Sequence, residues 1–206
     1  MLEQYFDQIR HADRLPNSLF APEKVVEQSK LFASHPAVQT FHAYVLDDEG
    51  TSNHHLLMTA APLAGAVFFL SHDGDSRVVF DSAAQFLTAV REAHVQEVSV
   101  SEFHPHQSPM VTDQAALADF IRTLHERGEC SDLIVSLVPS LDLEDLSLLQ
   151  LLVSDADFYL GEAVAMEIEK RPSRTLLPIA IACASHRHPQ VAGAGARAVR
   201  RIQQIA

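Results

Sequence analysis

The chain has 206 residues, of which 47% are hydrophobic and only 7 are glycine, so it can bury a sizeable core and does not have the composition of a disordered or fibrous protein. Its longest apolar stretch, residues 56–70, is interrupted by Thr59, Pro62 and Gly65 and is shorter than the roughly 20 residues needed to cross a bilayer. The formal net charge of −12 argues against nucleic-acid binding and favours a basic partner.

The N-terminal segment MLEQYFDQIRHADRLP is acidic and amphipathic and lacks the basic and apolar regions of a secretory signal, which predicts a cytoplasmic protein. Helices are expected at Leu2–Arg14 and from Pro22, because proline suits a first helical turn. The only two cysteines, Cys130 and Cys183, stand alone in the sequence. They are expected to be buried, reduced and structural.

Residues 38–80 have the pattern of four antiparallel strands. The β-rich runs are VQTFHAYVL, NHHLLMTAA, AVFFL and RVVF, at 38–46, 53–61, 66–70 and 77–80. Asp73 and Gly74 lie between the last two runs, and an Asp-Gly pair is a strong hairpin signal because glycine adopts positive φ without steric cost. We therefore interpret SHDGDS as a turn, and not as a metal or acid–base site.

An amphipathic helix is expected after the last strand, capped by Asp81 or Ser82. The segment VQEVSVSEF, residues 95–103, predicts an edge strand, and HPHQSP, residues 104–109, predicts a linker. These elements together predict a small α+β domain over 1–102, with an antiparallel sheet and flanking helices.

The second half, 110–206, has only helical patterns, with Gly128 as the cap that ends its first helix. Two of the expected helices match at an offset of 33 residues, with Phe158 on Val191 and Ala165 on Ala198. An offset of this size is typical of helical-hairpin arrays, so we expect an all-α, HEAT-like domain. The glycines of GAGAR, 193–197, are expected to allow close helix packing.

Charge is unevenly distributed over this half. Residues 141–169 contain eight acids and no Lys or Arg, whereas 170–206 contain seven bases and no acid. We expect the two segments to pack side by side and neutralise each other. The acids at 142–145 and 155–157 also precede predicted helices, where carboxylates cap free N–H groups.

The twelve histidines are the most obvious candidates for chemistry, but pairs such as His104 and His106 have no further ligand at a suitable spacing. Because a tight metal site needs three or four ligands, we expect surface histidines and no metal. The chain also lacks a G-x-S-x-G elbow and a phosphate-binding glycine loop, so no catalytic residue and no cofactor are predicted.

The run PLAGAVFFLSHDGDSRVVFDSAAQFLTAV has the order strand, acidic turn with glycine, strand, and helix capped by Asp-Ser. Over residues 62–92 it resembles the C-terminal part of the SUKH superfamily of immunity proteins. This resemblance implies a compact α+β fold that protects bacteria by binding and blocking toxins. It does not extend to the helical half, and no functional residue is carried over from it.

These observations favour a non-catalytic protein-binding module, in its sharpest form an immunity protein that neutralises a basic toxin. The expected partner-binding residues are Asp155, Asp157 and Glu162. One alternative is a metal-dependent hydrolase using the four residues His54, His55, His72 and Asp73. Another is a structural scaffold subunit whose helical half packs against its own copy.

Overall fold

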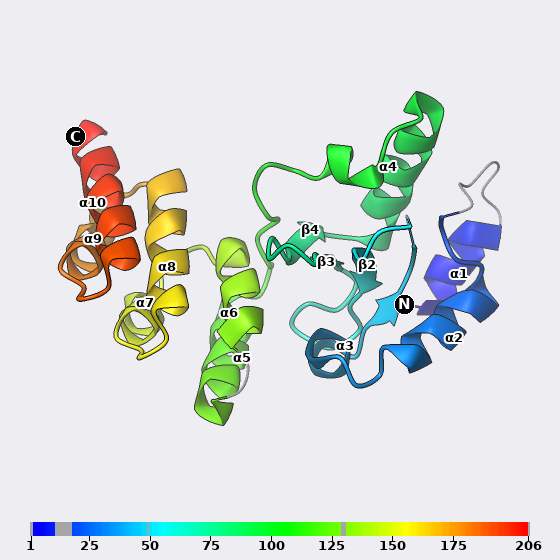
Figure 1. Ribbon diagram of the computed structural model, residues 1–206, viewed down its shortest axis with the longest axis horizontal. Helices are drawn as coiled ribbons and strands as arrows, with labels where there is room; N and C mark the ends of the chain where they lie inside the picture. The colour runs from blue at the N-terminus through cyan, green and yellow to red at the C-terminus, as the bar shows by residue number, and fades with distance from the viewer. Residues whose placement is uncertain (1, 11–17, 49, 129–130, 206) are drawn as a thin grey trace. The chain divides into compact units, whose positions relative to one another are not determined.

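The computed structural model describes residues 2–10, 18–48, 50–128 and 131–205, and the chain divides into two compact units, Met1–Asp113 and Gln114–Ala206. The first unit contains a small antiparallel sheet with helices, and the described part of the second contains helices alone (Figure 1). This confirms the predicted fold class. None of the helices in the described ranges has the length and apolar character that a membrane crossing requires.

The sheet of the first unit is an antiparallel meander in which each strand pairs with its neighbour in sequence. Its strands are β1 (Tyr44–Val45), β2 (His54–Leu57), β3 (Val67–Leu70) and β4 (Arg77–Phe80). His55 is paired with Phe69, and Phe69 with Arg77, so these three side chains leave the sheet on one face. Gly74, in the turn between β3 and β4, has φ +91°, which confirms the predicted hairpin.

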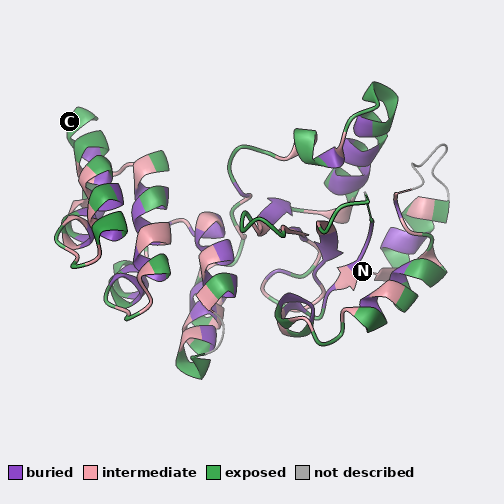
Figure 2. Ribbon diagram, in the orientation of Figure 1, coloured by how far each residue is buried: buried purple, intermediate pink, exposed green. Residues whose placement is uncertain are grey.

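Helices cover both faces of this sheet. They are α1 (Leu2–Arg10), α2 (Pro22–Leu31), α3 (Pro36–Phe41) and α4 (Ala83–Gln96). Tyr5 of α1 and Phe86 of α4 belong to one buried cluster with Val67 of β3, and the strands are largely buried (Figure 2). On the opposite face Phe41 of α3 packs against Phe68, with ring centroids 5.2 Å apart. The predicted extension of the first helix to Arg14 lies outside the described residues.

The first predicted strand, 38–46, is wrong over most of its length. Pro36 begins α3, and Nδ1 of His35 accepts a hydrogen bond from the backbone N–H of Ala37, which caps the helix. The β-branched and aromatic residues that suggested a strand therefore lie on a short helix, and only Tyr44–Val45 joins the sheet. Local capping has outweighed β-propensity here.

The predicted edge strand at 95–103 is also wrong. The helix α4, capped by Ser82 as predicted, continues to Gln96, and the chain then forms a short 3-10 helix, η1 (Val100–Phe103). The alternating valines of this segment have the sequence pattern of a half-buried strand, but Val95 is 81% exposed. No neighbouring strand is available to pair with them in the described part of the unit.

The second unit stacks helices against one another. They are α5 (Gln114–Arg127), α6 (Ser131–Leu137), the 3-10 helix η2 (Val138–Ser140), α7 (Leu146–Val153), α8 (Phe158–Lys170), the 3-10 helix η3 (Arg174–Leu176), α9 (Leu177–Ala184) and α10 (Pro189–Gln204). The helix α10 packs against both α8 and α9. Gly128, after α5, has φ +70°, as expected of a helix-ending glycine.

Close packing of α9 and α10 depends on Gly195. A Cβ atom at Gly195 would lie 2.6 Å from Cβ of Cys183, closer than nonbonded carbon atoms approach each other. The prediction that these glycines permit close helix contact is confirmed at Gly195, and the expected burial of Cys183 is confirmed with it. The other cysteine, Cys130, lies outside the described residues.

The predicted neutralisation between the acidic and basic segments is found at two places. Nε of Arg197 on α10 lies 2.8 Å from a carboxylate oxygen of Glu169 on α8. Within α8 and just after it, Lys170 and Arg171 both pair with the buried carboxylate of Glu167. The basic C-terminal segment is thus partly used to balance acids inside the helical unit.

Candidate functional site

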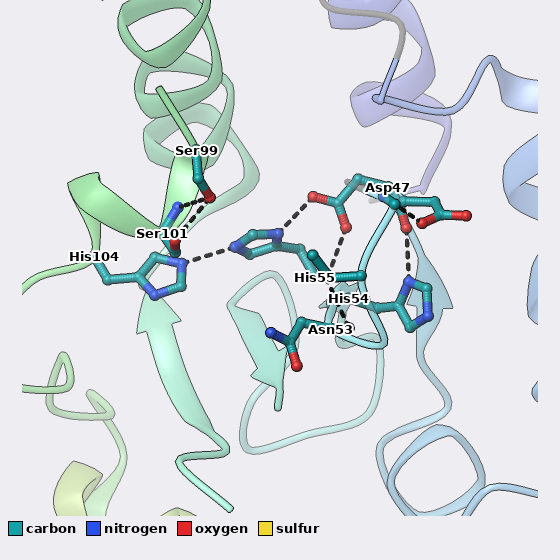
Figure 3. A network of polar contacts seen from close by, with 10 residues as sticks. Asp47, Asn53, His54, His55, Ser99, Ser101 and His104 are labelled. Atoms are coloured by element: carbon teal, nitrogen blue, oxygen red, sulfur yellow. Dashed lines mark hydrogen bonds and ion pairs between the residues drawn. The ribbon is translucent and has the colours of Figure 1, made fainter. Parts of the chain in front are cut away.

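A buried carboxylate–histidine pair lies in the first unit, at the start of β2. Oδ2 of Asp47 is 2.6 Å from Nδ1 of His55, and Oδ1 of Asp47 accepts a hydrogen bond of 2.8 Å from the backbone N–H of His55 (Figure 3). The two residues are 2% and 1% exposed. The pairing satisfies the carboxylate and the imidazole together, as burial of such groups requires.

A second histidine extends this pair toward the segment that follows η1. Nε2 of His104 lies 2.8 Å from Nε2 of His55, although the two residues are 49 positions apart. Nδ1 of His55 donates to Asp47, so in a neutral His55 Nε2 accepts from Nε2–H of His104, and Nδ1 of His104 is then the acceptor at the end of the Asp47–His55–His104 network. In a protonated His55 the bond to His104 runs the other way.

The network keeps His104 neutral. Burial, as the largest cause, together with the nearby His55 and Arg77, lowers the pKa of His104 from its usual 6.5 to about 3. Nη2 of Arg77 donates to the carbonyl of Pro105 at 2.8 Å, which holds its charge close to the network. With a pKa this low, His104 carries no charge near pH 7.

Tyr5 of α1 lies near the other end of the network. Burial raises the pKa of Tyr5 well above its usual value, and the negative charge of Asp47 raises it further. The Tyr5 hydroxyl is buried and has no hydrogen-bond partner among the described residues. A buried hydroxyl without a hydrogen-bond partner destabilises the folded protein, so the Tyr5 hydroxyl lowers the stability of the apolar cluster that surrounds it.

Aromatic rings enclose the network and limit what it can do. The ring of His55 lies 4.9 Å from that of Phe86 and 5.2 Å from that of Phe69, and His104 lies 4.6 Å from Phe69, edge to face. This enclosure, with Arg77 bound to Pro105, fastens the segment after η1 onto the sheet. The arrangement supports a structural role.

Two sequence expectations are therefore corrected. His55 is a core residue and His104 is half-buried, so neither is a surface histidine, and the segment 104–109 is anchored at His104. Sequence reasoning missed Asp47, which directly follows the predicted strand 38–46. The available signal was an acid directly after the apolar residues Val45 and Leu46, where the chain is still in the core beyond the end of β1.

The residues of the hydrolase hypothesis do not meet at one point. His54, next to His55 on β2, bonds through Nδ1 to the carbonyl of Asp47, and its ring packs against Phe32. His72 and Asp73 are exposed in the hairpin turn. Over residues 2–10, 18–48, 50–128 and 131–205, no three His, Cys, Asp or Glu side chains gather in a way that could hold a metal ion.

Asp155 and Asp157, two of the expected partner-binding residues, make bonds within the helical unit. Oδ2 of Asp155 is 2.7 Å from Nε2 of His125, and its Oδ1 accepts from the N–H of Asp157. Asp157 caps α8 by accepting from the N–H of Tyr159, as its position before a helix predicts. Both carboxylates remain partly exposed, but each is held in place by these bonds.

Glu162, the third expected residue, lies on the outer face of α8. Tyr159 and Met166 on the same face are 53% and 42% exposed, and the spacing 159, 162, 166 places all three in one line along the helix. Among the described residues no ion pair reaches Glu162. We call Tyr159, Glu162, Ala163 and Met166 the α8 stripe.

The protein thus offers two candidate sites, a buried network in the first unit and an exposed stripe in the second. Comparison with protein-family models, with curated proteins and with solved structures found no match. Function must therefore be argued from the geometry of these sites.

Proposed function

We propose that the protein is a non-catalytic protein-binding module whose helical unit binds a basic protein. The observation that carries this proposal is the α8 stripe, where an exposed tyrosine and an exposed methionine flank a carboxylate. Tyrosine and methionine are enriched at protein interfaces, and tyrosine is common among the residues that dominate binding energy. Such side chains favour water-excluded contact with a partner.

Charge supports a basic partner. The chain carries 27 acids against 15 Lys and Arg, and two basic residues near the end of α8 are already paired with Glu167. Asp155 and Asp157, at the start of α8, keep part of their surface open to solvent and lie one turn from Tyr159. An acidic surface of this kind speeds association with a basic protein and makes binding sensitive to salt.

Neutralisation of a bacterial toxin is the sharpest form of this proposal. The order β3, acidic turn, β4 and α4, over residues 67–96, agrees with the strand, turn, strand and capped helix on which the SUKH resemblance rests. A basic nuclease-type toxin would be a suitable partner, because its nucleic-acid cleft has the charge opposite to that of this chain. Such an immunity protein would act in the cytoplasm of a bacterium by covering that cleft.

The experiment measures binding of the full chain to the purified product of the gene adjacent to its own, by calorimetry at two salt concentrations. We expect Tyr159→Ala and Glu162→Lys each to weaken binding about tenfold or more, equal to about 1.4 kcal/mol, and Glu162→Lys to reduce the salt dependence. The matched control is Glu23→Lys, which makes the same charge change on an exposed site of α2 in the other unit.

Two outcomes overturn the proposal. If the adjacent gene product neither binds the chain nor loses activity in its presence, the immunity form is wrong. If binding occurs but the three variants behave alike, the α8 stripe is not the interface. Unchanged thermal melting of each variant shows that a loss of binding does not come from unfolding.

The metal-dependent hydrolase gains no support from the positions of His54, His55, His72 and Asp73, since only His54 and His55 share a common partner, Asp47. It makes a separate prediction, a stoichiometric metal in protein purified without a histidine tag. The scaffold alternative predicts a solution mass above that of one chain, 22.7 kDa.

A further inference from the structure

A cavity of about 220 Å³ opens in the helical unit between the start of α5 and the loop that leads into α7. Its inner wall is apolar and includes Ala118 of α5 and Leu148 and Leu149 of α7. Asp142 and Glu144 also line it, and whereas Ala118, Leu148 and Leu149 are buried, Asp142 is half-buried and Glu144 is exposed. The cavity is therefore apolar at depth and acidic at its mouth.

The loop that forms this cavity is held in a fixed shape. The side chain of Gln114 donates to the carbonyl of Ser140 at 3.0 Å and accepts from the N–H of Asp142 at 2.8 Å. Leu143 is buried and has φ +66°, a left-handed conformation that is strained for leucine. Because the side chain of Gln114 and the burial of Leu143 hold this conformation, the cavity exists before any ligand binds.

The carboxylates around the cavity differ in how far they are neutralised. Asp145 lies 2.6 Å from Nη2 of Arg122 and caps α7 through the N–H of Leu148. Burial raises the pKa of Asp145, but the N–H of Leu148, Arg122 and Ser147 outweigh it and lower the pKa to about 2. Asp145 is thus an internal partner of Arg122 and not a free acceptor.

Asp142 and Glu144 are the carboxylates available to a ligand. Oδ1 of Asp142 accepts from the N–H of Glu144 at 2.9 Å, which leaves its other oxygen unused, and Glu144 is exposed. No cation pairs with either carboxylate within the described part of the unit. Arg171, which donates to the carbonyl of Leu141 in the same loop, is balanced by Glu167.

We propose that this cavity receives a lysine or arginine side chain of the basic partner, an inference that rests on the proposed function. Both side chains have an aliphatic stem and a cationic end, which match the apolar wall and the acidic rim in that order. The stem would lie against Ala118, Leu148 and Leu149, and the cation would reach Asp142 and Glu144. An anionic side chain would meet two like charges at the mouth.

The test uses side-chain analogues on the full chain labelled with ¹⁵N. The probes are n-butylguanidinium and n-butylammonium, with n-butanol as the neutral analogue. We expect the two cations to shift the amide signals of Leu143 and Leu148 in a saturable way, with dissociation constants of the order of 1 mM for ligands of this size. The alcohol should bind at least fivefold more weakly.

Three variants sharpen the result. Ala115 is exposed at the mouth of the cavity, so Ala115→Leu should block it without disturbing the core and abolish the shifts. The double variant Asp142→Asn with Glu144→Gln should weaken binding of the cations at least fivefold and leave that of n-butanol unchanged. The control Glu126→Gln removes an exposed charge from α5 outside the cavity lining and should have no effect.

Equal binding of the alcohol and the cations, or no shift with any probe, overturns the inference. Binding of the protein partner to the variants then distinguishes this inference from the proposed function. If Tyr159→Ala weakens the partner and Ala115→Leu does not, the cavity is not its anchor and the proposed function stands. If the cations bind the cavity but no variant of the α8 stripe affects a partner, the proposed function fails and the cavity remains a site for cationic side chains.

Discussion

The carboxylate of Asp47 bonds to His55 twice, at 2.6 Å to the ring Nδ1 and at 2.8 Å to the backbone N–H. One buried acid therefore fixes both the position of β2 at His55 and the tautomer of its imidazole. That tautomer in turn decides which way the hydrogen bond to His104 runs. The stability of the first unit should depend strongly on Asp47.

Asp47→Ala should lower the free energy of unfolding of the first unit by about 3–5 kcal/mol, because it leaves two buried donors without a partner. Urea denaturation followed by circular dichroism measures this change. Asp48→Asn is the matched control, since Asp48 is exposed and its side chain accepts from the N–H of Gly50, a bond that asparagine can also accept. An Asp47→Ala protein as stable as the control would contradict the role we give to the network.

The pKa of His104 predicts how stability changes with pH. It is about 3 in the folded protein and near its ordinary 6.5 in the unfolded chain, so the unfolded chain binds more protons between these values. Stability should therefore fall as pH is lowered from 6.5 toward 3, by up to about 1.4 kcal/mol per pH unit from this group. Above pH 6.5 its contribution is constant.

The variant His104→Gln isolates this effect. It should be less stable than the natural chain at pH 7.5, and the difference should shrink as pH falls below 6.5, because only the natural chain loses the contribution of His104. Carboxylates titrate in both proteins and cancel in the difference. A difference that stays constant down to pH 4 would show that His104 is not held neutral.

Gly195 and Gly193 form a matched pair on α10. Gly195→Ala should destabilise the helical unit by about 1–3 kcal/mol, because the new methyl group would overlap Cys183 and force α9 and α10 apart. In Gly193→Ala the methyl group meets only the end of the Arg197 side chain, at 3.9 Å, so helix propensity should stabilise the protein by up to about 1 kcal/mol. Thermal melting should show a lower melting temperature for Gly195→Ala and a higher one for Gly193→Ala than for the natural chain.

Cys183 reports on the same contact. Burial raises the pKa of its thiol to about 12, so almost no thiolate is present at pH 8. Iodoacetamide should leave Cys183 unmodified in the native protein and alkylate it in 6 M urea, as measured by peptide mass spectrometry. In Gly195→Ala, alkylation under native conditions should become faster, and an unchanged rate would show that α9 and α10 do not separate.

Local features of the fold were predictable from sequence. The Asp73-Gly74 turn, the Ser82 cap and the close approach at Gly195 follow from the conformational or steric properties of single residues. The strand predictions at 38–41 and 95–103 failed because β-branched residues also occur on short helices when proline or a capping side chain starts them.

The buried network was not predictable in the same way. His55 and His104 are 49 residues apart, and nothing in their spacing indicates that they touch. Their partner Asp47 looks like any acid in a turn until the fold places it in the core. Of the three expected partner-binding residues, Asp157 was predictable as the cap of α8, but the bond of Asp155 to His125 was not, because His125 reaches Asp155 from another helix.

The consecutive strand order of the sheet also bears on how the first unit folds. Each strand pairs with the next one along the chain, so the sheet can form by closing short loops, at little cost in chain entropy. The bond between His55 and His104 closes a much longer loop and should form after the strands have paired. We therefore expect substitutions at His104 to change mainly the unfolding rate, and substitutions in the β3–β4 hairpin to change the folding rate.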